Sequence, residues 1–309
     1  MTELVKTKLA VAESNSTELE TLKVVIDDGS KAAKLVCVNN QGDLVPLLTQ
    51  NSFVADFRVS HDGLIPFNYL IDGLQRFSHH SESSNALETT DVAHQYDEIS
   101  RLNVHHALHS SGLEPQDVDL YVTLPLSQFY TALGETNDEN KKRKKDNLMK
   151  PVERYIDGKR VSFNVVSVTV FPESLPAVTR ADEIELIESF ESSLVIDLGG
   201  TTLDVASITG QLEQISRVKG FDRIGCSIVY DEVRRYLDSS KLNASYAYIQ
   251  HLVDNRDNKA SLKVSSDDLD GVFQAVNSAV AQLQENVITA VTQVEERPHN
   301  VFLVGGGSY

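Results

Sequence analysis

Two short segments place an acidic residue, glycines and hydroxyls at the end of an apolar run. They are residues 24–30 (VVIDDGS) and residues 194–204 (LVIDLGGTTLD). Glycines let the backbone approach a ligand closely, and consecutive N–H groups in such a turn bind anions. An acid beside a phosphate requires a cation between them, and Mg²⁺ is the usual one. The two segments therefore predict phosphate-binding loops that work with a metal ion.

Each of these segments reads as a β-hairpin, because a second apolar run follows each turn. Neither contains the Gly-Lys-Ser/Thr of the phosphate loop that joins a strand to a helix. A third glycine cluster, Gly305–Gly307, follows the apolar run 301–304. Residues 27–30 alone would also suit an ordinary turn. Together the three segments indicate two pseudo-repeated hairpin domains that grip one nucleotide, with the third loop under the sugar or base.

Glu173 is a further candidate for chemistry. It lies at the end of a predicted strand, residues 161–171, and between two prolines, Pro172 and Pro176. The prolines make this a stiff segment that holds the acid in place. Two interpretations compete here, because Glu173 would suit either the cap of the next helix or a catalytic base.

The surrounding pattern predicts the elements that position these residues. Apolar spacing indicates helices over 91–111, 179–192 and 267–294, and a fourth that opens near Gly225. Alternating runs indicate strands over 117–124, 161–171 and 211–218, and several short strands between 23 and 57. We expect a flexible extension over 1–22, a first domain over 23–190 and a second over 191–309.

Composition narrows the class of function. The chain has 309 residues, is 41% hydrophobic and carries a net charge of −17, which argues against direct binding to nucleic acid or to an anionic membrane. No apolar stretch is long enough to span a membrane, so we expect a cytoplasmic protein. His105 and His109 stand one helical turn apart, but solvated or capping histidines are a better interpretation than a metal pair. For the basic run 141–145 we favour a protein contact edge around Lys144.

The chain resembles the ParM/StbA plasmid segregation proteins, which are bacterial actin-like ATPases. The resemblance runs from about residue 24 to residue 307. It is carried by the two hairpins and by these further segments: 104–108 (VHHAL), 111–113 (SGL), 123–126 (TLPL), 143–145 (RKK), 172–174 (PES) and 304–307 (VGGG). It implies an α/β, actin-like ATPase fold, with two ribonuclease H-like domains, a mixed five-stranded sheet in each, and a nucleotide cleft between them.

The resemblance also implies roles for individual residues. Asp27 and Asp197 would hold Mg²⁺, mainly through its water shell, and Lys34 would neutralise the phosphates. Glu173 would orient or deprotonate the attacking water, with Asp197 as the second catalytic residue. The remaining nucleotide-binding residues come from the three loops and the helix start, and they are Asp28, Gly29, Ser30, Gly199, Gly200, Thr201, Thr202, Gly225, Gly306 and Gly307.

The implied function is ATP-dependent filament formation that separates plasmid copies through a DNA-binding adaptor protein. The pattern does not decide between ATP and GTP. Two alternatives stay open: a small-molecule kinase on the same fold, and a nucleotide-gated interaction protein that does not polymerise. The C-terminal helices that return to the first domain in this family are absent from the expected pattern, since the sequence stops at Tyr309.

Overall fold

The structure is a computed structural model of the 309-residue chain. It describes residues 21–38, 42–59, 65–81, 83, 86–87, 89, 92–179, 182–242, 244, 246–256, 258 and 266–307. The predicted extension over 1–22 lies outside these residues, apart from its last two.

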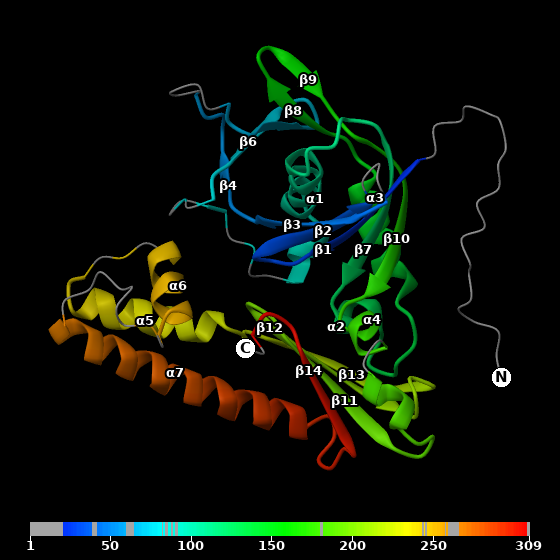
Figure 1. The fold of residues 1–309 in the computed structure, drawn as a ribbon, viewed down its shortest axis with the longest axis vertical. Helices are drawn as coiled ribbons and strands as arrows, with labels where there is room; N and C mark the ends of the chain where they lie inside the picture. The colour runs from blue at the N-terminus through cyan, green and yellow to red at the C-terminus, as the bar shows by residue number, and fades with distance from the viewer. Residues whose placement is uncertain are drawn as a thin grey trace.

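The described elements follow one another along the chain as shown in Figure 1. The strands are β1 (Leu22–Asp28), β2 (Ala32–Val38), β3 (Leu44–Gln50), β4 (Phe53–Ala55), β5 (Asn68–Ile71), β6 (Gln75–His79), β7 (Asp117–Leu124), β8 (Val152–Ile156), β9 (Lys159–Val161), β10 (Asn164–Pro172), β11 (Ser192–Leu198), β12 (Thr202–Thr209), β13 (Gln214–Asp222) and β14 (Asn300–Val304). The α-helices are α1 (Glu98–Ser110), α2 (Leu126–Phe129), α3 (Asp138–Leu148), α4 (Leu175–Val178), α5 (Ser227–Ser239), α6 (Tyr246–Asp254) and α7 (Ser266–Thr292). Two 3₁₀ turns cover Val92–Tyr96 and Asp182–Leu186.

The first sheet has five strands in the order β10-β7-β1-β2-β3. β1 and β2 form an antiparallel hairpin, and β7 and β10 run parallel to β1 on its other side. Side chains alternate along β1, so Val24 and Ile26 join the buried core beneath α1 while Val25 is exposed. This alternation decides which of the two acids at the end of β1 faces the site.

The second sheet repeats this arrangement with the order β13-β12-β11-β14. The hairpin β11–β12 is antiparallel and β14 runs parallel to β11, as β7 does to β1. The predicted actin-like α/β fold is confirmed, although this sheet has four strands among the described residues where five were expected. One face is covered by α5, α6 and α7 through a large apolar cluster.

The two sheets are joined by a pair of neighbouring strands. β7 and β10 end side by side, with Leu124 opposite Pro172, and they lead into α2 and α4. Leu126 of α2 and Leu175 of α4 pack against Val195 of β11, on the face of the second sheet opposite its long helices. In Figure 1 these two short helices lie between the two sheets. The chain therefore passes from one sheet to the other where Glu173 is located.

A third, smaller sheet has the order β4-β6-β5-β8-β9 and packs on α1. Residues 91–111 were predicted as one helix, but they form a 3₁₀ turn and then α1, which is capped by Asp97. The Asp97 side chain accepts hydrogen bonds from the N–H groups of Ile99 and Ser100.

The helix predicted over 179–192 is wrong. Within the described part of this segment the 3₁₀ turn at 182–186 is the only helical element, and Ser192 already belongs to β11. A full helix would place Glu185, Glu188 and Glu191 three residues apart on one face, where like charges repel.

No described helix combines the length and apolar character needed to cross a membrane.

Candidate functional site

The turn of the first hairpin is held from outside by neighbouring segments. The Ser30 carbonyl accepts hydrogen bonds from Asn51 Nδ2 at 3.0 Å and from Thr89 Oγ1 at 2.7 Å. The Asn51 backbone N–H donates to the Lys31 carbonyl at 2.8 Å. A Cβ on Gly29 would lie 3.2 Å from the Ala32 carbonyl oxygen, so the turn is tight at that point. These contacts fix the position of the tip.

The second hairpin turns at residues 199–201 and lies against the start of α5. The N–H of Cys226 donates to the Gly199 carbonyl at 3.2 Å, and that of Ser227 donates to the Gly200 carbonyl at 2.8 Å. Gly225 permits this approach, because a Cβ there would lie 2.7 Å from the Thr201 nitrogen. The turn and the helix start therefore form one packed unit.

The third glycine cluster closes on the same hairpin. The Gly307 N–H donates to the Leu198 carbonyl at 2.9 Å. Gly305 has a φ of +91°, and a Cβ on it would lie 2.4 Å from Asp197 Oδ1. A Cβ on Gly306 would meet nothing within 4 Å, so this glycine borders open space. The structure thus brings Gly199, Gly200, Thr201, Gly225 and the third cluster to one place.

Acidic side chains from both sheets meet between the hairpins. The Thr123 hydroxyl lies 3.0 Å from Asp27 Oδ1 and 3.5 Å from Glu173 Oε1. Burial raises the pKa of Glu173 well above its usual value, and repulsion from Asp27 and Asp197 raises it further. Burial also raises the pKa of Asp197, against the opposing effect of its hydrogen bond from Ser174. This is a site that disfavours several negative charges at once.

Lys34 is the cation of this cluster. It lies opposite Asp27 in the β1–β2 register, and its Nζ is 2.9 Å from Asp27 Oδ2. Partial burial lowers the pKa of Lys34, but Asp27, Glu173 and Asp197 outweigh this and raise it overall. Lys34 therefore stays charged beside the acids, as the predicted phosphate-neutralising role requires.

Ser174 holds the joint between Glu173 and Asp197. Its φ of 65° and ψ of −41°, with the Leu175 N–H donating to the Glu173 carbonyl at 2.6 Å, make a strained γ-turn. Its hydroxyl donates to Asp197 Oδ2. A non-glycine residue in such a conformation points to a functional constraint. Thr123 and Ser174 lie in two of the segments that carry the resemblance, but neither was given a role from the sequence, because their partners Asp27 and Asp197 are distant along the chain.

The Asp28 side chain does not face the phosphate loops, which corrects its predicted place among the nucleotide-binding residues. It points to the opposite side of β1 from Asp27, because neighbouring residues of a strand alternate. It is 1% exposed and forms a buried ion pair with Lys144 of α3. Lys144 also donates to Gln95 Oε1 at 2.6 Å and to Ser100 Oγ at 3.2 Å.

Lys144 itself cannot take part in the predicted contact edge, whereas an edge made by the exposed residues of the basic run stays a prediction. Lys144 is fully buried, and with Asn147 and Leu148 it lies on the face of α3 that packs inward. A run of basic residues extends around the whole helix at 3.6 residues per turn. Lys142 has a 75% exposed side chain, so the charges of the run are divided between two environments.

The histidines of α1 are core residues. His105 and His109 are both buried, and burial lowers the pKa of His105 to about 3 and that of His109 to about 4. Within the part of the chain that the structure describes, no three His, Cys, Asp or Glu side chains are grouped so that they could hold a metal ion directly. Asp27 and Asp197 nevertheless offer the hard oxygen donors that suit a largely hydrated Mg²⁺.

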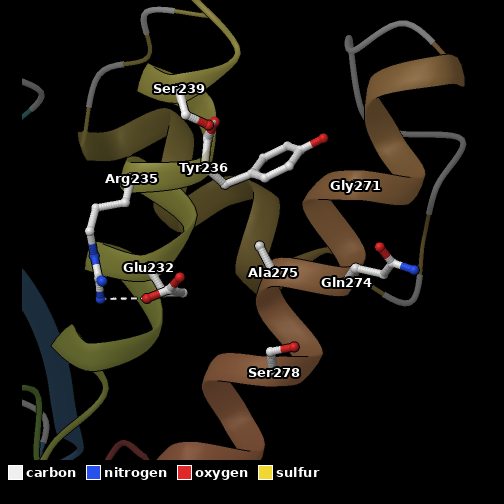
Figure 2. Close-up of a pocket in the computed structure, with 8 residues that line it drawn as sticks. All are labelled: Glu232, Arg235, Tyr236, Ser239, Gly271, Gln274, Ala275 and Ser278. Atoms are coloured by element: carbon white, nitrogen blue, oxygen red, sulfur yellow. Dashed lines mark hydrogen bonds and ion pairs between the residues drawn. The ribbon is translucent and has the colours of Figure 1, made fainter.

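A separate pocket of about 360 Å³ lies between α5 and α7. Figure 2 shows its lining, in which the Tyr236 ring extends toward α7 at Gly271. The lining residues are Glu232, Arg235, Tyr236, Ser239, Gly271, Gln274, Ala275 and Ser278. None of the predicted site residues lines this pocket, so it is distinct from the cluster between the hairpins.

Comparison with known protein families accounts for almost the whole described chain. Residues 22–184 match the family model of the plasmid segregation protein ParM, N-terminal. Residues 187–309 match that of the plasmid segregation protein ParM, C-terminal. No curated protein matches the chain.

Solved structures of actin homologues share the fold. An archaeal actin homologue is 18% identical with a TM-score of 0.67, over 93% of this chain and 88% of that one. Its complex with ADP is 17% identical with a TM-score of 0.66, over the same shares of 93% and 88%. A 15-stranded ParM filament from Clostridium botulinum is 15% identical with a TM-score of 0.65, over 93% of this chain and 89% of that one. At these identities the comparison establishes the fold.

Proposed function

The chain belongs to the ParM family of plasmid segregation proteins, and from this premise we propose that it is a Mg²⁺-dependent ATPase that assembles into filaments. The nucleotide would bind between the two hairpins, with Gly306 and Gly307 on the adenosine side. An actin homologue of the same fold has been solved with ADP, which supports nucleotide binding. A ParM filament of the same fold supports self-association.

The observation that carries this proposal is the position of Glu173. Burial raises the pKa of its carboxyl, and the charges of Asp27 on the first hairpin and of Asp197 on the second raise it further. Lys34 supplies one positive charge to this group of three acids, and the repulsion that remains among them favours the binding of a further cation. A Mg²⁺ ion bound together with the nucleotide would supply that positive charge.

Different residues of the site would contribute different parts of phosphoryl transfer. The backbone N–H groups of residues 29–30 and 199–201 would bind the phosphates, and Lys34 would neutralise part of their charge. When bound, Mg²⁺ would balance the charge that develops on the phosphate oxygens, held through its water shell by Asp27 and Asp197. Positioning and electrostatics of this kind supply most of the acceleration.

Glu173 would orient the attacking water and take its proton. A carboxylate with a raised pKa is a better base than an ordinary glutamate, provided that it is ionised at the working pH. Turnover should therefore rise as pH rises through the raised pKa of Glu173. Thr123 and Ser174 keep the carboxyl groups around it in place.

The partners that we propose are further copies of the chain and a DNA-binding adaptor protein, in the cytoplasm. The net charge of −17 fits a protein that meets DNA through an adaptor.

The test uses Glu173→Gln, which keeps the shape of the side chain but cannot accept the proton. We expect phosphate release to fall by about 10²-fold or more, while light scattering after addition of ATP and Mg²⁺ still reports assembly. Glu296→Gln, at an exposed acid outside the site, is the matched control. Unchanged turnover in Glu173→Gln would remove this residue from the mechanism. If the wild-type chain showed no ATP-dependent scattering, the filament proposal would fail and the kinase alternative would gain support.

A further inference from the structure

The side chain of Lys31 crosses from the first hairpin to the second. A Cβ on Gly200 would lie 2.6 Å from Lys31 Cε and 2.8 Å from its Cδ, so the aliphatic stem runs directly over this glycine. The Lys31 Nζ lies 3.9 Å from the centre of the Tyr230 ring on α5. Lys31 thus spans the gap between the two phosphate loops.

The backbone at this position is fixed, so the crossing follows from the fold. The carbonyl of Lys31 accepts from the Asn51 N–H at 2.8 Å, and that of the preceding Ser30 is bound by Asn51 and Thr89. The side chain of Lys31 can move while the hairpin tip stays in place. A residue placed in this way can change partners without a rearrangement of the loop.

The two lysines of this hairpin are in different electrostatic states. Lys34 pairs with Asp27 at 2.9 Å. Burial lowers the pKa of Lys31 to about 8. Three nearby groups oppose this effect: Cys226 just before α5, Asp254 on α6 and Asp231 on α5. The ammonium of Lys31 rests on an aromatic face, which is a weaker partner than a phosphate.

We propose that Lys31 is a further phosphate-binding residue, whose ammonium leaves the Tyr230 ring for the phosphate chain of a nucleotide held between Ser30 and Gly200. The inference rests on the proposed function and extends it to a residue outside the family motifs. Lysine binds phosphate as a compact point charge at the end of a flexible stem, which suits a contact made across a gap.

This role has a signature in the pH dependence of binding. Phosphate favours the charged form, so the pKa of Lys31 is higher in the complex than in the free protein. Binding then takes up a proton at pH values above about 8, and affinity falls as pH rises further. The Cys226 thiol is another titratable group near Lys31, and burial raises its pKa from 9.0.

The experiment measures the affinity for ADP with Mg²⁺ by calorimetry at about pH 7 and about pH 9, which avoids turnover. The full chain is compared with Lys31→Met, Lys31→Arg and Cys226→Ser, with Lys142→Met as the exposed control. We expect Lys31→Met to bind about tenfold more weakly at the lower pH and to lose the weakening toward the higher pH. Lys31→Arg should restore affinity and keep it at both pH values, since arginine stays charged. Binding by Cys226→Ser should still weaken toward the higher pH, with the weakening moved to lower pH because the effect of Cys226 that raises the pKa of Lys31 is lost.

The outcomes separate the two proposals. If the wild-type chain binds ADP and Lys31→Met binds equally well with the same pH dependence, the role of Lys31 is overturned and the nucleotide site stands. Tighter binding by Lys31→Met would also overturn it, because the side chain would then be competing with the nucleotide. If the wild-type chain shows no binding heat, the proposed function itself fails.

Discussion

Asp204 ties the start of α2 to the second sheet. Its carboxylate accepts a hydrogen bond from the Ser127 N–H at 2.7 Å. Burial raises the pKa of Asp204 to about 6; the bonds from Ser127 oppose this and the charge of Asp197 adds to it. The folded chain therefore holds a proton that the unfolded chain releases between about pH 4 and about pH 6. The contribution of Asp204 to the free energy of unfolding is therefore favourable below about pH 4, and it decreases as the pH rises from about 4 to about 6.

We predict that Asp204→Asn removes this pH dependence. Asparagine keeps an acceptor for the Ser127 N–H but brings no charge into the core. At about pH 7.5 the variant should have a free energy of unfolding about 1–3 kcal/mol above that of the wild type, and at about pH 4 the two should agree. Urea unfolding at both pH values measures this. Glu296→Gln, at an exposed acid that is not among the groups that shift the pKa of Asp204, is the control. A variant that loses stability at the higher pH would contradict the assignment.

Motif reading located the main residues of the candidate site but not their orientation. The segments around Asp27, Glu173 and Asp197 are short strings in the sequence, and the structure brings them together. Asp28 was grouped with them because it is adjacent in sequence, yet strand alternation turns it away. Lys31 contacts Tyr230, and Ser174 donates to Asp197. These partners are distant along the chain, so no local sequence pattern reveals them.

At the scale of elements, α3 is bound to the first hairpin by one buried ion pair, between Lys144 and Asp28. Lys144 is enclosed by Asp28, Gln95 and Ser100 at the end of β1. Removing one member of a buried pair leaves the other charge uncompensated, which costs more than the pair contributes. The position of the first hairpin thus depends on a helix far from it in sequence.

We predict that Lys144→Met lowers the free energy of unfolding by about 3–5 kcal/mol, because the charge of Asp28 is left buried. The double variant Asp28→Leu/Lys144→Met should be less destabilised than the single one. Lys142→Met, on the exposed side of the same helix, should change stability by less than about 0.5 kcal/mol. Chemical unfolding of the three proteins decides the matter. Equal stability of Lys144→Met and Lys142→Met would show that the pair does not form.

The contact between α5 and α7 depends on one residue without a side chain. A Cβ on Gly271 would lie 1.7 Å from Tyr236 Oη and 2.4 Å from its Cζ, so the ring is seated directly on the α7 backbone. Figure 2 shows the ring extending toward this glycine. Glycine inside a helix is unfavourable by itself, so close packing is the reason for its presence.

We predict that Gly271→Ala destabilises the chain by about 1–3 kcal/mol, despite the better helix propensity of alanine. Tyr236→Leu should remove the clash, so the double variant should be more stable than the sum of the two single changes indicates. Asn277→Ala, at an exposed position of α7 that does not line this pocket, is the control. Thermal unfolding is a sufficient measurement. A stabilised Gly271→Ala would mean that the ring moves aside freely.

Elements with strong periodicity were predicted correctly from the sequence, and those decided by tertiary contacts were not. α7 was expected over 267–294 and covers Ser266–Thr292. The two hairpins were also expected, since glycine turns between apolar runs are local signals. The small third sheet was not identified as a unit, because β8 pairs with β5 across about 80 residues of chain. The acidic segment 179–192 had helical spacing but repelling charges.

At the scale of the whole molecule, net charge governs association. A charge of −17 makes copies of the chain repel one another. Salt screens this repulsion, since the Debye length falls from about 30 Å at 0.01 M to about 10 Å at 0.1 M.

We predict that the critical concentration for ATP-dependent assembly falls as ionic strength rises from about 0.05 M to about 0.3 M. Pelleting of assembled protein across this range gives the critical concentration, and nucleotide affinity at each salt concentration is the control for binding. A critical concentration that rises with salt would show that attractive charge pairs between copies outweigh the overall repulsion.

The turn at Ser174 has a mechanical consequence. Ser174 lies between β10 of the first sheet and α4, where the chain passes toward the second sheet. It combines a strained backbone torsion with a hydrogen bond to Asp197 of the second hairpin. A rotation that relaxes this torsion would also change the hydrogen bond from Ser174 to Asp197, so the backbone of one residue couples the two sheets. A nucleotide bound between the hairpins, as proposed, would restrain this joint, and its hydrolysis would remove the restraint.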